Sequence, residues 1–177
     1  MESRELEDLA LLFIRDAAEP TMWIDRWAVS YPIAQQVEVS RTQNIETWQQ
    51  LLNEEWLNIQ SKSVAMVAHG VGVSALLAWL YLADTDVQRR IQNVILVAPV
   101  RSTFPDDDCH TLQRVRFQCK TALVIGQNDA DCPADWAAQQ ADNWRAKLLV
   151  SPHDCHLNSS LHGWQWGMKL MQEMLLS

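Results

Sequence analysis

Three polar turns in this sequence each follow an apolar run and contain residues of the types that carry out nucleophilic catalysis. The first turn is AHGVG at 68–72, the second contains Asp129, and the third contains His156. A histidine held by an aspartate can take a proton from a hydroxyl, because the carboxylate fixes the imidazole tautomer and stabilises the imidazolium. The order along the chain, a tight turn, an acid and then a base, fits one kind of acyl-transfer site.

Gly70 stands in the first turn where such a site needs its nucleophile. A turn of this kind projects one side chain above a strand at a strained backbone angle, and small residues flank it because strand and helix nearly touch. Ala68 and Gly72 are suitably small, but Gly70 has no side chain with which to attack a carbonyl. Glycine also tolerates the backbone angle without strain. The residues therefore predict a turn that keeps its shape and lacks its nucleophile.

The elements that must position these turns alternate between short apolar runs and longer helical patterns. Unbroken apolar runs are typical of parallel strands covered on both faces. We expect strands at Leu9–Ile14, Val37–Val39, Val64–Ala68, Val94–Ala98, Ala122–Ile125 and Leu148–Val150. We expect helices at Thr21–Ser30, Ile45–Ile59, Gly72–Ala83, Ala134–Arg145 and Gly163–Leu176, and a loop with a short helix over Val100–Gln118. Asn44 can cap the second of these helices.

The alternation predicts a single α/β domain over residues 1–177. Its expected form is a three-layer sandwich, with crossover helices on both faces of a mainly parallel six-stranded sheet. Ligands of such sheets bind at the carboxyl ends of the strands. We therefore expect Gly70, Asp129 and His156 to cluster at that edge.

Nine tryptophans are many for a chain of 177 residues. Trp23 and Trp27 are one helical turn apart, and Trp48 and Trp56 share a face with Leu52. This spacing predicts amphipathic helices packed on a core, in preference to a tryptophan-lined ligand groove.

Charge and hydropathy exclude several classes of protein. The formal net charge is −8, whereas a nucleic-acid surface needs clustered lysine and arginine. No apolar stretch approaches the ~18 residues of a transmembrane helix, and the acidic N-terminus lacks the basic start of a secretory signal. We expect a cytoplasmic protein that binds neither nucleic acid nor membrane, and whose cysteines are free thiols.

Several motifs resemble those of the small serine hydrolases of the retinoblastoma-binding-protein-9 type. MVAHGVGVSALLA resembles the LVAHSLGC elbow of that family, VILVAPV its LVAP strand, and HDCHLNSSLHGWQWG its C-terminal tail. The resemblance covers nearly the whole chain and implies a compact α/β-hydrolase fold with a flavodoxin-like strand order. It also implies that Asp129 is the acid, that His156 is the base, and that residue 70 is the nucleophile position.

A second departure from that family follows the first strand. The family has a glycine-rich loop there, which brings a backbone N–H toward the oxyanion, whereas this chain has RDAAEP at 15–20. Asp16 and Glu19 would oppose a developing negative charge unless they point away from it. We expect Arg15 and Asp16 to line a ligand-binding site with His69 and Val71.

Two hypotheses about function stay open. The first is a catalytically impaired hydrolase-fold protein, a pseudoenzyme, that binds a small-molecule ligand or a protein partner. The alternative is an active, esterase-like hydrolase that uses a relocated nucleophile or a water activated by His156. The candidate nucleophiles are Ser74, Ser151, Ser159, Ser160, Cys132 and Cys155.

Metal binding is a third possibility that the spacing does not favour. HDCH at 153–156 and DDDCH at 106–110 contain residues of metal-binding types. Zinc sites commonly show paired ligand spacings such as two CxxC motifs, and these are absent here. We therefore expect no metal site and no cofactor.

Overall fold

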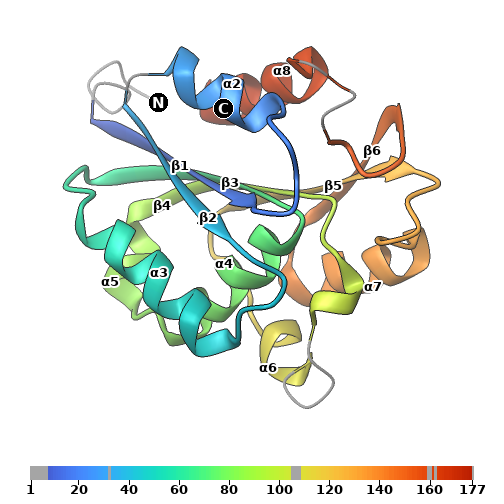
Figure 1. The fold of residues 1–177 in the computed structure, drawn as a ribbon. Helices are drawn as coiled ribbons and strands as arrows, with labels where there is room; N and C mark the ends of the chain where they lie inside the picture. The colour runs from blue at the N-terminus through green and yellow to red at the C-terminus, as the bar shows by residue number, and fades with distance from the viewer. Residues whose placement is uncertain (1–7, 32, 105–108, 159–160, 162, 177) are drawn as a thin grey trace.

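A computed structural model of the chain describes residues 8–31, 33–104, 109–158, 161 and 163–176. Its centre is a six-stranded parallel sheet with the order β2-β1-β3-β4-β5-β6 (Figure 1). The strands are β1 (Leu9–Asp16), β2 (Ala34–Val39), β3 (Ser63–His69), β4 (Ile91–Val97), β5 (Lys120–Gln127) and β6 (Lys147–Asp154). All six expected strands are confirmed, as are the α/β fold class and the flavodoxin-like order.

Helices cover both faces of the sheet, as Figure 1 shows. On one face lie α2 (Trp23–Ser30) and α8 (Gln165–Leu176). On the other face lie α3 (Ile45–Leu57), α4 (Val71–Leu82), α5 (Thr85–Arg90), α6 (Cys109–Gln113) and α7 (Ala134–Trp144), and a short 3₁₀ helix, η1 (Arg101–Thr103), follows β4. The three-layer sandwich is therefore confirmed.

Side-chain caps mark the starts of helices α3 and α5. The predicted cap of α3 is present, because Asn44 Oδ1 accepts a hydrogen bond of 2.8 Å from the Thr47 amide. Helix α5 was not expected from the sequence. It is capped in the same way, by Asp84 Oδ1 on the Val87 amide at 2.9 Å. None of its residues is buried, so its sequence has no apolar period from which a helix could be predicted.

The tryptophans pack in the core, as their spacing predicted. Trp23, Trp27, Trp48 and Trp56 are all buried. Trp23 lies between Trp27 and Trp164, with ring centroids 4.6 Å from each. Its Nε1 donates to the Leu157 carbonyl at 2.7 Å. This bond ties the segment after β6 to α2, and that segment carries His156.

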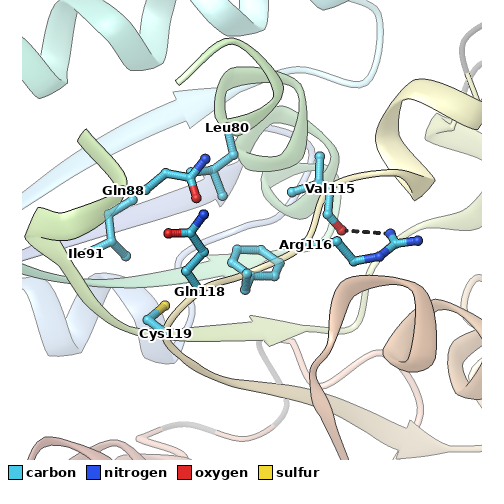
Figure 2. A pocket seen from close by; sticks show the side chains of 8 residues that line it. Leu80, Gln88, Ile91, Val115, Arg116, Gln118 and Cys119 are labelled. Atoms are coloured by element: carbon cyan, nitrogen blue, oxygen red, sulfur yellow. Dashed lines mark hydrogen bonds between the residues drawn. The ribbon is translucent and has the colours of Figure 1, made fainter. Parts of the chain in front are cut away.

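At the opposite edge of the sheet, where the strands begin, an open hollow of about 380 Å³ lies beside the first residues of β5 and β6. A cavity of about 10 Å³ lies there (Figure 2), which is space for about one water molecule. Its lining residues are Leu80, Gln88, Ile91, Val115, Arg116, Phe117, Gln118 and Cys119. Among the described residues, no helix is both long and apolar enough to cross a membrane.

Candidate active site at the carboxyl edge of the sheet

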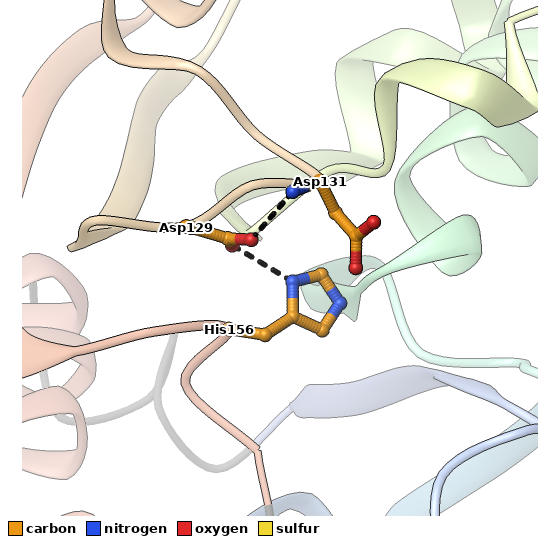
Figure 3. A group of neighbouring side chains, drawn as sticks. All are labelled: Asp129, Asp131 and His156. Atoms are coloured by element: carbon orange, nitrogen blue, oxygen red, sulfur yellow. Dashed lines mark hydrogen bonds and ion pairs between the residues drawn. The ribbon is translucent and has the colours of Figure 1, made fainter.

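Asp129 and His156 form a hydrogen-bonded pair. Asp129 follows β5, His156 follows β6, and His156 Nδ1 donates to Asp129 Oδ2 at 2.8 Å (Figure 3). Asp129 Oδ1 accepts a second bond of 2.9 Å from the Asp131 amide. Both side chains of the pair are buried. The carboxylate therefore fixes the imidazole tautomer and leaves Nε2 as the free nitrogen.

The pair shifts the pKa values of both partners. Burial lowers the pKa of His156, but the hydrogen bond and charge of Asp129, with the charges of Glu19 and Asp131, outweigh burial and raise it above its usual value. Burial raises the pKa of Asp129, but the bond and charge of His156 and the amides of Asp131 and Cys132 outweigh burial and lower it. Each group thus favours the charged form of the other.

Close backbone contacts hold the segment that carries His156. A Cβ on Gly126 would lie 1.9 Å from the Cys155 carbonyl oxygen, so only glycine allows β5 and this segment to approach so closely. The Cys155 amide donates to the Gln127 carbonyl at 2.7 Å. His69 Nε2 donates to the His156 carbonyl at 3.0 Å, which joins the base to the end of β3.

The pKa values of His69 and His156 are shifted in opposite directions although the centroids of their rings are only 5.0 Å apart. His69 is fully buried, and burial together with the charge of His156 lowers its pKa to about 4. Its ring is therefore neutral at neutral pH. His69 is part of the framework beneath the site. Its ring packs edge-on against the Trp23 ring, with the two ring centroids 5.9 Å apart.

Gly70 forms the tight turn that the sequence predicted. Its backbone has φ 59° and ψ −127°, a conformation that strains other residues. The Gly70 amide donates to the Val97 carbonyl at 3.0 Å. A Cβ on Gly72 would lie 2.5 Å from the Ile14 carbonyl oxygen, so helix α4 meets β1 closely at this point. The turn keeps the geometry of a nucleophile elbow.

The Asp16 carboxylate fills the space in front of that turn. Its Oδ2 lies 2.8 Å from the position of a Cβ on residue 70. The same oxygen accepts a long bond of 3.4 Å from the Val71 amide and a bond of 2.9 Å from Arg41 Nε. Oδ1 accepts a bond of 2.9 Å from the Ala18 amide. In hydrolases with this elbow, the amide after the nucleophile contributes to the oxyanion hole, and here it faces the protein's own carboxylate.

Arg41 is a site residue that sequence reasoning missed. It follows β2 within a polar segment, and nothing in its spacing connects it to Asp16, 25 residues earlier. Its Nη2 also lies 3.7 Å from Glu19 Oε1. Glu19 points toward the base, with Oε1 3.9 Å from His156 Nε2. Neither Asp16 nor Glu19 therefore points away from the site.

Arg15 is turned toward the edge of the sheet and braces the loop after β1. Its guanidinium forms ion pairs with Glu38 at 3.2 Å and Asp25 at 3.4 Å, and it donates to the Glu19 carbonyl at 2.5 Å. The three other residues expected to line a ligand site, His69, Val71 and Asp16, are completely buried. His69 lies beneath the site, whereas the Asp16 carboxylate lies in front of the turn and faces the Val71 amide.

The proposed substitute nucleophiles have other partners or surroundings. Ser74 Oγ is buried against Thr103 Oγ1 at 2.8 Å, and Ser151 Oγ lies 2.8 Å from His153 Nδ1. Burial and the charges of Asp129 and Asp131 raise the pKa of Cys132 to about 12. Cys155 is an exposed free thiol. Ser159 and Ser160 lie outside the described residues. No described residue forms a hydrogen bond with His156 Nε2, which is buried.

The fold agrees with comparisons to known proteins. Residues 15–173 match the family described as Serine hydrolase, and the chain belongs to that family. No curated protein matches the sequence. Among solved structures, a protein from Pectobacterium atrosepticum described as a YdeN-like hydrolase has a TM-score of 0.82 at 19% identity, over 97% of this chain and 93% of that one.

Two Bacillus subtilis structures are similar as well. The ydeN gene product has a TM-score of 0.70 at 13% identity, over 95% of this chain and 100% of that chain. Carboxylesterase CesB has a TM-score of 0.66 at 10% identity, over 96% of this chain and 84% of that chain. At such identities the likeness establishes the shared α/β-hydrolase fold alone.

Proposed function

We propose that this chain is a serine hydrolase family protein that has lost acyl-enzyme catalysis and keeps a binding site at the strand tips. The observation that carries the proposal is the Asp16 carboxylate, which occupies the space in front of Gly70 and faces the Val71 amide. A substrate carbonyl would have to displace this carboxylate to reach the amide. A negative charge beside a developing oxyanion opposes the reaction.

Two separate features of the site support this loss. Gly70 supplies no nucleophile, and the ion pair of Asp16 with Arg41 fills the place of the oxyanion. Replacing glycine with serine at residue 70 would therefore leave the second obstacle in place. Asp16 is fully buried and held by three donors, so moving it aside has a large free-energy cost.

The outward-facing part of the site is acidic. Glu19 and His156 are nearly buried, and Asp131 is exposed beside them. An open hollow of about 480 Å³ adjoins Asp131. It is lined by Arg101, Ser102, Phe104, Ala130, Asp131 and Pro133. We assign ligand contact to this hollow, which adjoins the loop that carries Asp129 and Asp131.

One observation favours the alternative, a hydrolase that works through activated water. The Asp129–His156 pair is intact, and its Nε2 has no hydrogen-bond partner among the described residues. A neutral imidazole in this position could take a proton from water. The structural neighbour described as carboxylesterase CesB makes esters the substrates to test first for that reaction.

Labelling with a fluorophosphonate and hydrolysis of short aryl esters test the proposal. The proteins to compare are the natural chain, Gly70→Ser, Gly70→Ser with Asp16→Gly, and this double variant with His156→Ala. We expect the first two to be inert, and the double variant to be labelled only when His156 is present. His156-dependent ester turnover by the natural chain would overturn the proposal in favour of the activated-water reaction.

A further inference from the structure

We propose that Glu19, Asp131 and His156 bind one divalent transition-metal ion, with Asp129 holding the histidine in position. The proposal concerns the same strand tips as the proposed function, but it does not depend on the loss of acyl-enzyme chemistry. The ligand that it assigns to the outward-facing part of the site is a divalent transition-metal cation.

The first argument is the unpartnered nitrogen of His156. Its side chain is 9% exposed, and Nε2 is buried without a hydrogen-bond partner among the described residues. Nδ1 is engaged, because it donates to Asp129 Oδ2 at 2.8 Å. A histidine that donates one ring N–H to a carboxylate presents the lone pair of the other nitrogen, which is the usual arrangement of a metal-binding histidine.

The second argument is the distance between His156 and Glu19. Nε2 and Glu19 Oε1 are 3.9 Å apart, which is too long for a hydrogen bond. Two ligands at 2.0–2.1 Å from one tetrahedral ion are about 3.3 Å apart. A shift of several tenths of an ångström would bring these two atoms onto the same ion.

The third ligand is Asp131. Ligand atoms of Asp129, Asp131 and His156 all lie within 4.8 Å of one another. Figure 3 shows the Asp131 carboxylate beside the edge of the His156 ring, while Asp129 lies on the side of Nδ1. Because Asp131 is exposed, its side chain can turn toward the ion without disturbing the core.

The charge around the site favours a cation. Four carboxylates, those of Asp16, Glu19, Asp129 and Asp131, lie at these strand tips, and Arg41 forms ion pairs with two of them. Arg41 is committed to Asp16 at 2.9 Å and approaches Glu19 only to 3.7 Å. The nearly buried Glu19 carboxylate therefore has incomplete compensation, and buried carboxylates are usually paired or coordinate metals.

The mixed ligand set indicates the class of ion. Imidazole with carboxylates suits zinc and neighbouring transition metals, whereas calcium and magnesium prefer oxygen ligands alone. Cobalt(II) is a suitable probe because its visible spectrum reports the ligands. Binding through a cysteine would add a thiolate-to-cobalt charge-transfer band that an oxygen and imidazole site lacks.

The experiment is titration of the full chain with cobalt(II), followed by calorimetry and visible absorption. We expect one ion per chain and no thiolate band. Glu19→Gln and Asp131→Asn should each weaken binding at least about tenfold, and His156→Gln should abolish it. Asp129→Asn keeps the three ligands and should weaken binding by about 10–100-fold. Circular dichroism confirms the folding of each variant.

Matched controls are the exposed residues Glu173 and Asp142, and His153 of the same segment. Glu173→Gln, Asp142→Asn and His153→Gln should bind cobalt(II) as the natural chain does. No binding, a thiolate band, or equal binding by the Glu19 and Asp131 variants would overturn the metal site. Such a result leaves the loss of acyl-enzyme chemistry standing, because fluorophosphonate labelling tests that loss without metal.

Discussion

The two halves of the site differ in the side chains that they present. The acid–base half, Asp129 and His156, keeps a short hydrogen bond and a free, buried Nε2. The elbow half consists of His69, Gly70, Asp16 and Arg41. Residue 70 has no side chain, and the Asp16 carboxylate, bonded to Arg41, lies in front of its turn.

This difference shows that the geometry of the turn does not come from a side chain at residue 70. The turn is held by the Gly70 amide on Val97 and by the close contact of Gly72 with Ile14, and both are contacts of packing and backbone. The acid–base pair, by contrast, consists of side chains alone. Its geometry therefore depends on a contact between side chains of two separate loops.

The largest expected effect is a loss of folding stability at low pH, caused by protonation of His69 in the elbow half. His69 has a pKa of about 4 in the folded chain against an ordinary 6.5. The unfolded chain therefore binds the extra proton first, and stability falls as the pH drops from about 6.5 to 4, by about 3 kcal/mol. Urea unfolding at several pH values measures this loss. His69→Gln should remove most of it, whereas His153→Gln should not.

The same experiment separates the two halves, because His156 acts in the opposite direction. Its pKa is raised in the folded chain, so its stabilisation is complete below about 6.5 and is lost as the pH rises through the folded value. In an NMR titration His156 should keep its proton to higher pH than His69, and Asp129→Asn should lower the pKa of His156. If His69→Gln and the natural chain lost the same amount of stability between about pH 6.5 and 4, the assignment of that loss to His69 would be wrong.

The next largest effect is expected for Arg41→Met. The variant leaves the fully buried Asp16 carboxylate with two backbone amides and no cation. We expect a loss of about 2 to 3 kcal/mol, toward the low end because the Arg41 side chain is 32% exposed. Asp16→Asn should reduce this loss when it is combined with Arg41→Met, and chemical denaturation of all three variants gives the coupling.

The control for Arg41 is Arg26→Met, at an exposed position of α2. It should change the free energy of unfolding by no more than about 0.5 kcal/mol. Equal losses in both arginine variants would mean that the Asp16–Arg41 pair contributes nothing specific to the elbow half.

The smallest expected effect is that of Gly70→Ala, which should lower the free energy of unfolding by about 1 to 2 kcal/mol. The cost combines the strained backbone at φ 59° with the contact of Cβ and Asp16 Oδ2 at 2.8 Å. The cost of Gly70→Ala should be smaller in the double variant with Asp16→Ala than in the natural chain, because the contact with Oδ2 disappears and only the backbone strain remains. Asp16→Ala alone is the reference for the double variant. Gly163→Ala is the matched control, since its Cβ meets nothing within 4 Å. Thermal unfolding of the four variants checks the order.

The sequence predicted the strands and most helices because their signals are local. The apolar runs of β3, β4 and β5 and the Asn44 cap depend on neighbours in the chain. Helix α5 buries none of its residues, and therefore it lacks the apolar period on which the other helix predictions depended.

The site was predictable to a lesser extent. Asp129 and His156 were found because the ends of parallel strands meet at one edge, and their hydrogen bond follows from that placement. The direction of Asp16 could not be predicted, since it depends on Arg41, 25 residues away. The approach of Glu19 to His156 likewise joins two separate loops and has no common spacing.

The tryptophan cluster beneath the site gives the molecule an internal optical reporter. Trp23 lies 4.6 Å from both Trp27 and Trp164, and the rings of Trp27 and Trp164 are stacked with an interplanar angle of 8°. Indoles at this separation couple their electronic transitions, so the cluster should give a distinct near-ultraviolet circular dichroism signal. Trp23 also holds the Leu157 carbonyl. The signal should therefore report directly when the segment carrying His156 leaves the sheet.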